Sequence, residues 1–166
     1  MLIIFSGLLG VGKTAIAKSL STKISAAYLR ADTIEQCLVE SKLVERKDLR
    51  DYGYYIGYSI ARENLANGLT VIADSVNPIK LTRDAWRKVA AERDFPYIEV
   101  EIVCSDIEEH KKRVECRKSD ILNLSLPTWN DVQNRIYEKW DRERLIIDTS
   151  KISIEDAVKM ILEKIE

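Results

Sequence analysis

Hydrophobic residues gather in five short runs along the chain, separated by longer segments that mix polar and apolar positions. The runs are nearly continuous, as is typical of strands buried on both faces of a sheet. They cover residues 2–5, 69–73, 98–103 and 145–147, with a weaker run at 27–29. Between them, a helical period places Ile16 and Leu20 on one helix face, and Trp86 and Val89 on another. This alternation predicts an α/β fold with a parallel sheet.

Polar residues that can cap a helix stand before four of the predicted helices: Asn77, Asp106, Thr128 and Ser153. Asn77 is followed by a proline at the first helical position, and Thr128 precedes Asp131 by three residues. Residues 119–127 have the least periodic pattern in the second half of the chain and predict a loop.

The composition is that of an ordinary single domain, which we expect to span residues 1–166. Hydrophobic residues make up 46% of the chain, and no apolar stretch is long enough to cross a membrane. The first hydrophobic run lacks the features of a signal peptide, so we expect a cytoplasmic protein. With 26 basic and 27 acidic residues, the chain has no overall positive field to recruit nucleic acid or anionic lipid.

The cysteines and the one histidine carry no recognisable site pattern. Cys37, Cys104 and Cys116 are widely spaced and form no C-x-x-C pair, which argues against a disulfide framework and a structural zinc site. We expect reduced, half-buried thiols. His110 lies in a run of charged residues and is expected to be a solvated helix residue without a role.

A glycine-rich segment stands between the first hydrophobic run and the first amphipathic helix. Residues 7–14 read GLLGVGKT, the pattern G-x-x-x-x-G-K-[ST]. Glycines let successive backbone N–H groups curl around phosphate oxygens at a helix N-terminus; a glycine turn without a ligand is the alternative. Lys13 is expected to neutralise the β- and γ-phosphates, and Thr14 to ligate Mg²⁺. The predicted ATP-binding residues are Gly7, Leu8, Leu9, Gly10, Val11, Gly12, Lys13, Thr14 and Ala15.

Two carboxylates follow predicted strands. Asp74 stands at the carboxyl end of a buried strand, the edge of an open α/β sheet where ligands bind, so it can face the metal ion. A role in capping a turn is the alternative. Asp32 follows the weaker strand and is predicted to be a general base that accepts the proton of an attacking hydroxyl. Its alternative role is to cap the segment 33–39.

Two arginines stand four residues apart before the aperiodic segment. This spacing places Arg113 and Arg117 on one face of a helix. Together with the loop that follows, they predict a lid of about residues 113–127 whose arginines cover the transferring phosphoryl group and exclude water. Surface pairing with Glu109 is the alternative.

A tyrosine-rich segment precedes the strand at 69–73. Tyr54 and Tyr58 alternate with Gly53 and Gly57, and glycines four apart are costly inside a helix. They indicate close approach by another part of the chain or by a ligand. Core packing and the wall of an acceptor pocket are the two interpretations.

The segments GLLGVGKT, RADTIEQ, VIADSVNP and EHKKRVECR followed by PTW resemble the P-loop small-kinase group of predicted ATP-binding kinases, the AAA_33 type. The resemblance covers about residues 2–148. The chain is similar to the kinase domain of polynucleotide 5′-hydroxyl kinases. It is more distantly similar to gluconate, shikimate and adenylylsulfate kinases, chloramphenicol phosphotransferase and zeta toxins. The resemblance implies a three-layer α/β/α P-loop NTPase fold, with a five-stranded parallel sheet in the order 2-3-1-4-5 and a helical lid.

The resemblance also implies roles for individual residues. Asp32 matches the base and Asp74 a second acidic residue at a strand end. Arg113 and Arg117 match the lid arginines, which act in catalysis, with Arg117 also contacting the nucleotide. Residues around Thr149 are implied to lie beside the adenine.

One position departs from the family pattern. Many relatives carry an arginine three residues beyond the base, where it grips the acceptor, and this chain has Glu35 there. Because a carboxylate cannot hold an anion, we expect a small hydroxyl-bearing acceptor, of cationic or polyhydroxylated character, rather than a polynucleotide.

The sequence therefore predicts an ATP- and Mg²⁺-dependent kinase that transfers the γ-phosphate to a hydroxyl of a small molecule. Two alternatives stay open: a nucleotide-binding ATPase or regulatory switch without an acceptor, and a polynucleotide 5′-hydroxyl kinase. The chain has no [NT]KxD motif of the kind that reads guanine. We expect no membrane partner, and no pattern sets the oligomeric state.

Overall fold

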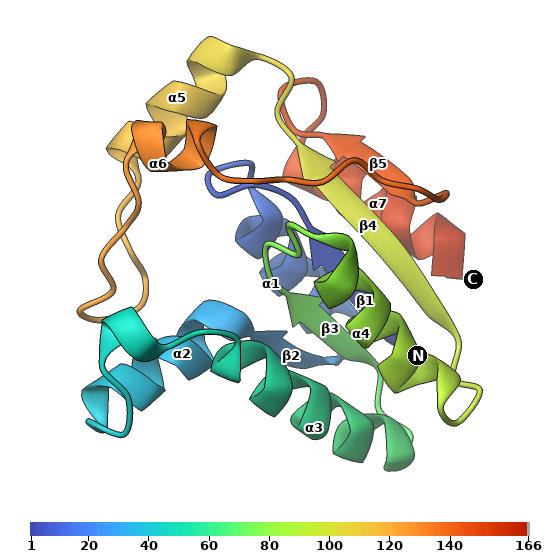
Figure 1. Cartoon of the computed structure of the whole chain (residues 1–166). Helices are drawn as coiled ribbons and strands as arrows, with labels where there is room; N and C mark the ends of the chain where they lie inside the picture. Colours follow the sequence, from blue (N-terminus) through green and yellow to red (C-terminus); the bar gives the residue numbers. More distant parts are fainter. Residues whose placement is uncertain (166) are drawn as a thin grey trace.

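Five parallel strands form the centre of the molecule (Figure 1). The computed structural model describes residues 1–165. The strands lie in the order β2-β3-β1-β4-β5, and each neighbouring pair is parallel, so the predicted α/β fold and the order 2-3-1-4-5 are confirmed. Their bounds are β1 (Leu2–Ser6), β2 (Ala27–Arg30), β3 (Val71–Asp74), β4 (Tyr97–Val103) and β5 (Leu145–Asp148).

Helices connect the strands and cover both faces of the sheet (Figure 1). A short 3₁₀-helix, η1 (Arg46–Asp48), lies between α2 and α3. The α-helices are α1 (Lys13–Ile24), α2 (Ala31–Glu40), α3 (Tyr52–Ala66), α4 (Lys80–Ala91), α5 (Ile107–Cys116), α6 (Trp129–Gln133) and α7 (Ile154–Ile165).

Two hydrophobic cores lie on opposite faces of the sheet. Side chains of a strand alternate between faces, so Ile3 and Phe5 enter one core with α1 and α7. Leu2 and Ile4 enter the other core with α3 and α4. All four side chains are fully buried, which explains why β1 is a continuous apolar run in the sequence.

Three of the four predicted helix caps are confirmed, and the fourth is wrong. Asp106 accepts from the Glu109 N–H, Ser153 bonds Asp156, and Thr128 forms a full capping box. Helix α4 begins three residues after Asn77. The Asn77 side chain is instead buried and donates to the carbonyl of Phe5 at 2.8 Å, so it ties the end of β1 to the loop after β3.

The two glycines of α3 allow close packing. A Cβ on Gly53 would lie 2.4 Å from Cγ of Glu35, and one on Gly57 would lie 3.3 Å from the Trp86 ring. Gly53 therefore makes room for a side chain of α2 and Gly57 for the core. The packing interpretation holds for both, while the neighbouring Tyr54 lines a cavity.

The exposure of the three cysteines differs in part from the sequence expectation. Cys37 and Cys116 are exposed and only Cys104 is half-buried, so the expected half-buried state is wrong for two of the three thiols.

Among residues 1–165, no helix has the length and apolar character that a membrane crossing requires.

Candidate nucleotide and acceptor sites

Two adjoining cavities lie at the carboxyl edge of the sheet. The first, which we call the loop cavity, has a volume of about 550 Å³ and is lined by residues of the glycine-rich segment together with Asp74. The second, the side cavity, has a volume of about 340 Å³ and is lined by residues of α2, α3 and the lid. The two cavities share four wall residues: Leu9, Asp32, Val76 and Arg117.

The glycine-rich segment forms a cradle of backbone donors. Gly7 and Gly10 have φ angles of 136° and 84°, and a Cβ on Gly10 would lie 2.4 Å from the Val114 side chain. Within the described part of the chain, no backbone N–H of residues 8–15 donates to a protein acceptor. These free donors at the N-terminus of α1 form a site that fits phosphate oxygens.

Lys13 lies buried beneath this cradle. Its Nζ donates to the carbonyl of Leu8 at 2.8 Å. Burial lowers the pKa of Lys13 to about 8, although the charge of Asp74 opposes this effect. No carboxylate of residues 1–165 forms an ion pair with Lys13. An anion in the cradle would therefore meet an ammonium group whose charge no carboxylate neutralises by direct pairing.

Thr14 and Asp74 place a hydroxyl and a carboxylate side by side. The Thr14 hydroxyl donates to Asp74 Oδ2 at 2.8 Å, and the Tyr28 hydroxyl donates to the same oxygen at 2.6 Å. Burial and the charge of Asp74 raise the pKa of Tyr28. A hydroxyl and a carboxylate suit Mg²⁺, which takes its remaining ligands from water and phosphate in such sites. The residues present thus fit a phosphate-bound metal ion.

Asp32 lies where the two cavities meet. It belongs to the first turn of α2, and the N-cap position is Arg30, so Asp32 is not the helix cap. Its carboxylate is 3.5 Å from Nη2 of Arg30. This position lets one side chain face both the phosphate cradle and a second molecule in the side cavity.

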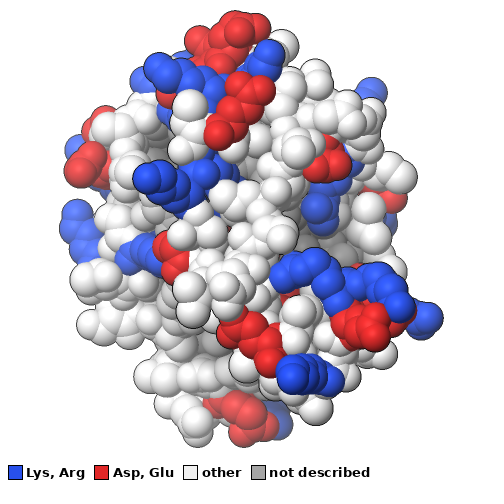
Figure 2. Space-filling model, turned by 90° about the vertical axis from the view of Figure 1, so that its left-hand side faces the viewer, with Lys and Arg blue, Asp and Glu red and all other residues white. Residues whose placement is uncertain are grey.

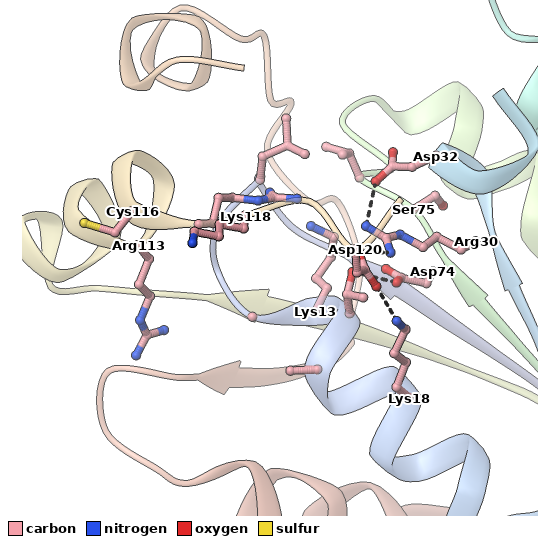
Figure 3. A pocket seen from close by; sticks show the side chains of 17 residues that line it. Lys13, Lys18, Arg30, Asp32, Asp74, Ser75, Arg113, Cys116, Lys118 and Asp120 are labelled. Atoms are coloured by element: carbon pink, nitrogen blue, oxygen red, sulfur yellow. Dashed lines mark hydrogen bonds and ion pairs between the residues drawn. The ribbon is translucent and has the colours of Figure 1, made fainter. Parts of the chain in front are cut away.

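A network that the sequence did not reveal holds the lid over the loop cavity (Figure 3). The guanidinium group of Arg30 is 4% exposed, and its Nη1 bonds Asp120 of the lid at 2.7 Å. Lys18 of α1 pairs with the same carboxylate. These two cations hold the pKa of Asp120 well below its usual range. No linear pattern joins residues 18, 30 and 120, because the fold alone brings them together.

Weakening this network should loosen the lid. In Asp120→Asn, both ion pairs lose a charge, and we expect proteases to cleave within residues 117–127 several-fold faster. The global free energy of unfolding should change by less than about 1 kcal/mol, since Asp120 is half exposed. Limited proteolysis with mass spectrometry measures both the site and the rate. Asp94→Asn, a change in an exposed turn, should cleave as the wild type does; an unchanged rate in Asp120→Asn would refute the network's role.

The two lid arginines occupy different places. Arg113 bonds Glu109 at 2.9 Å and donates to the Thr149 hydroxyl at 2.7 Å, so the Glu109 pairing is present. Arg117 follows the end of α5 with an extended backbone, so the prediction that both share one helix face is wrong. Both arginines line the loop cavity, but Arg113 points away from the Lys13–Asp120 group (Figure 3) and only Arg117 also lines the side cavity.

A third cavity of about 330 Å³ adjoins the loop cavity. Its walls include Arg113, Thr149 and apolar side chains of Ile16 and Ile152. The Thr149 hydroxyl also donates to the carbonyl of Val11 at 2.8 Å, which links the end of β5 to the glycine-rich segment. An apolar cavity with a few polar groups suits a flat ring such as a base.

His110 does not behave as the sequence suggested. The residue is 7% exposed, and its Nε2 lies 2.7 Å from the carbonyl of Leu9. Its ring forms a T-shaped pair with the ring of Trp129. The expected solvated position is therefore wrong, and His110 supports the glycine-rich segment from behind. The signal was Val114, an apolar residue four positions later on the same helix face.

The side cavity contains charges of both signs. Its walls include Asp32, Glu35, Arg46, Arg117 and Arg135. The arginines at 46 and 135 lie in η1 and after α6, and neither matched a motif. Burial and the charge of Asp32 raise the pKa of Glu35 to about 7, against the opposing effect of Arg135 and Arg46.

The raised pKa of Glu35 predicts a pH-dependent gain in stability for Glu35→Gln. The folded state holds this proton more tightly than the unfolded state, whose pKa is near 4.5, so stability falls as pH rises from about 4.5 through 7. Removing the charge should stabilise the protein by roughly 1–2 kcal/mol at pH 8, after allowance for partial exposure. Near pH 4 the gain should approach zero. Urea unfolding at both pH values tests this, and a gain that is equal at both would refute it.

The chain resembles several known proteins. The sequence model of the AAA_33 family, described as an AAA domain, matches residues 2–138. A probable adenylyl-sulfate kinase of Aeropyrum pernix is 25% identical over 161 residues, which cover 94% of this chain and 87% of the relative. The L-seryl-tRNA(Sec) kinase of Methanococcus maripaludis is 28% identical over 178 residues. That match covers 98% of this chain and 65% of the relative.

Solved structures share the fold. A putative kinase from Chloroflexus aurantiacus superimposes with a TM-score of 0.72 at 20% identity, covering 99% of this chain and 94% of that one. The Mycobacterium tuberculosis APS kinase in complex with AMPPNP and APS gives a TM-score of 0.72 at 19% identity. That match covers 98% of this chain and 95% of the other.

Proposed function

The chain belongs to the AAA_33 family, and from this premise we propose that it is an ATP-dependent kinase that transfers the γ-phosphate to a hydroxyl of a small molecule. The observation that carries the proposal is the position of Asp32, a carboxylate at the junction of the loop cavity and a second cavity. A site that only binds or hydrolyses nucleotide needs no second cavity of about 340 Å³ beside that carboxylate. The proposed catalytic unit is a single domain, residues 1–166, with a lid of about residues 113–127.

The glycine-rich segment would form most of the ATP-binding side of the site. The backbone N–H groups of residues 8–15 and the ammonium group of Lys13 would hold the phosphates. Thr14 and Asp74 would hold Mg²⁺. When bound, Mg·ATP supplies the phosphoryl group and the metal charge that offsets its oxygens. The third cavity, beside Thr149, would take the adenine.

The acceptor side depends on Asp32. Its carboxylate would accept the proton of the acceptor hydroxyl, and Arg30 would fix the orientation of that carboxylate from 3.5 Å. Arg117, which faces both cavities, would offset charge on the group in transfer. Arg113 would contact the nucleotide near Thr149. The lid would exclude water and so suppress hydrolysis.

The relatives support kinase chemistry but not one acceptor. The two curated relatives are named as kinases of an adenylyl sulfate and of a seryl-tRNA. Figure 2 shows the lid side of the molecule, where basic and acidic side chains are interspersed rather than gathered in a basic band. Polynucleotides are bound mainly by neutralising their phosphates, so this surface favours a small acceptor.

A transfer assay tests the proposal. The protein is mixed with Mg·ATP and a panel of sugars, sugar phosphates, nucleosides, aminoglycosides and oligonucleotides, and products are detected by mass spectrometry. We expect a phosphorylated small molecule, formed faster than ATP is hydrolysed without acceptor. Phosphorylated oligonucleotide as the main product would favour the polynucleotide kinase. Slow hydrolysis that no hydroxyl compound accelerates would favour the regulatory switch and overturn the proposal.

A further inference from the structure

We propose that the side cavity is built for an acceptor that carries an oxyanion, a phosphate, sulfate or carboxylate group, in addition to its hydroxyl. Arg46 and Arg135 would bind the oxyanion. This inference rests on the proposed function, because it names the class of acceptor for the same site. It reverses the expectation from Glu35, which pointed to a cationic or polyhydroxylated molecule.

In the described part of the chain, the arginines of the side cavity form no ion pair with the carboxylates that line it. Within residues 1–165, neither Arg46, Arg117 nor Arg135 forms an ion pair, although two carboxylates line the same cavity. In the neighbouring loop cavity, by contrast, Arg30 and Arg113 both pair with acids. Arg46 is oriented by a hydrogen bond to the amide oxygen of Gln36. Unpaired guanidinium groups around one cavity suit an oxyanion, which they bind in bidentate fashion.

The carboxylates of the cavity do not cancel this charge. Asp32 is already paired with Arg30. Glu35 packs against Gly53 and faces Asp32, Asp51, Arg46 and Arg135, and its pKa of about 7 leaves it partly protonated at neutral pH. Three arginines therefore face less than two full negative charges, and the cavity retains a net positive charge.

The arrangement also separates the two ends of the acceptor. Asp32 lies at the junction with the loop cavity, whereas Arg46 and Arg135 line only the side cavity. Apolar and aromatic walls come from Tyr54 and from residues 124–127 of the lid. A volume of about 340 Å³ holds a metabolite-sized molecule and not a folded macromolecule. The hydroxyl would face Asp32 while the oxyanion binds at the far end.

The family resemblance implies an arginine three residues beyond Asp32. Here Glu35 occupies that position, and the guanidinium groups come instead from η1 and from the segment after α6. The charge that the acceptor needs is thus supplied from two other elements.

Inorganic sulfate is a direct probe of this site. The full chain, saturated with Mg·AMPPNP so that the phosphate cradle is filled, is titrated with sulfate and followed by NMR of the arginine Nε–H groups. We expect saturable shifts at Arg46 and Arg135. The double variant Arg46→Gln/Arg135→Gln should lose at least ten-fold in sulfate affinity, and Arg93→Gln, an exposed arginine remote from the cavity, should titrate as the wild type does.

Two results would overturn the inference: wild-type protein without saturable sulfate binding at these arginines, or a double variant that binds sulfate as tightly as wild type. If Arg46→Lys binds sulfate more tightly than Arg46→Gln, the positive charge at this position contributes to sulfate binding. Thermal unfolding of each variant shows whether it is folded. Because the titration involves no transfer, it fails or succeeds independently of the kinase assay.

Discussion

Replacing Lys13 with alanine is expected to weaken nucleotide binding by about 10²- to 10³-fold and to abolish phosphoryl transfer. The ammonium group lies buried under the phosphate cradle and has no ion-pair partner among residues 1–165, so its charge is free to act on a bound anion. Truncating one partner of a buried, hydrogen-bonded charge pair costs about 2–5 kcal/mol of binding free energy. Calorimetry with Mg·AMPPNP measures the change.

A variant that fails to fold would also lose nucleotide affinity, so the thermal midpoint of unfolding is measured to separate the two causes. Burial that lowers the pKa of Lys13 to about 8 shows that the charged form is disfavoured in the free protein. Removal of the charge should therefore leave the thermal midpoint equal or higher. Lys23→Ala, an exposed change later in the same helix, should bind nucleotide as the wild type does. Unchanged affinity in Lys13→Ala would refute the phosphate-loop interpretation.

The sheet could be predicted because each buried strand leaves its own pattern in a short stretch of the sequence. β1 and β3 are buried on both faces, so they are continuous apolar runs, and helices with an apolar stripe alternate with them. The phosphate loop was equally visible, since free N–H groups and positive φ angles require glycine at fixed spacing. The strand order came from the resemblance and not from periodicity.

The acceptor side could not be predicted in the same way. Arg46 and Arg135 are 89 positions apart and line one cavity only because the fold brings η1 and the segment after α6 to the same edge of the molecule. Arg30 and Asp120 likewise pair across the loop cavity. Such contacts leave no period or spacing in the sequence. Glu35 departs from a family pattern that is visible in the sequence, but its surroundings, which decide the charge of the cavity, are visible only in the structure.

Replacing Asp32 with asparagine is expected to lower the transfer rate by about 10²- to 10⁴-fold while nucleotide binding persists. Asparagine keeps the shape of the side chain but cannot accept the hydroxyl proton. The buried Arg30 retains Asp120 as a partner, so the fold should tolerate the change. Single-turnover transfer and AMPPNP binding measure the two properties separately, and Asp94→Asn in an exposed turn should match the wild type in both.

Comparison with Glu35→Gln identifies the base. Among the described residues, Asp32 and Glu35 are the two carboxylates that line the side cavity, but only Asp32 also lines the loop cavity. A base must reach both the acceptor hydroxyl and the phosphoryl group in transfer, so Asp32→Asn should cost far more in rate than Glu35→Gln. If Asp32→Asn kept the full rate and Glu35→Gln lost it, Glu35 would be the base. The acceptor hydroxyl would then lie deeper in the side cavity, among the arginines.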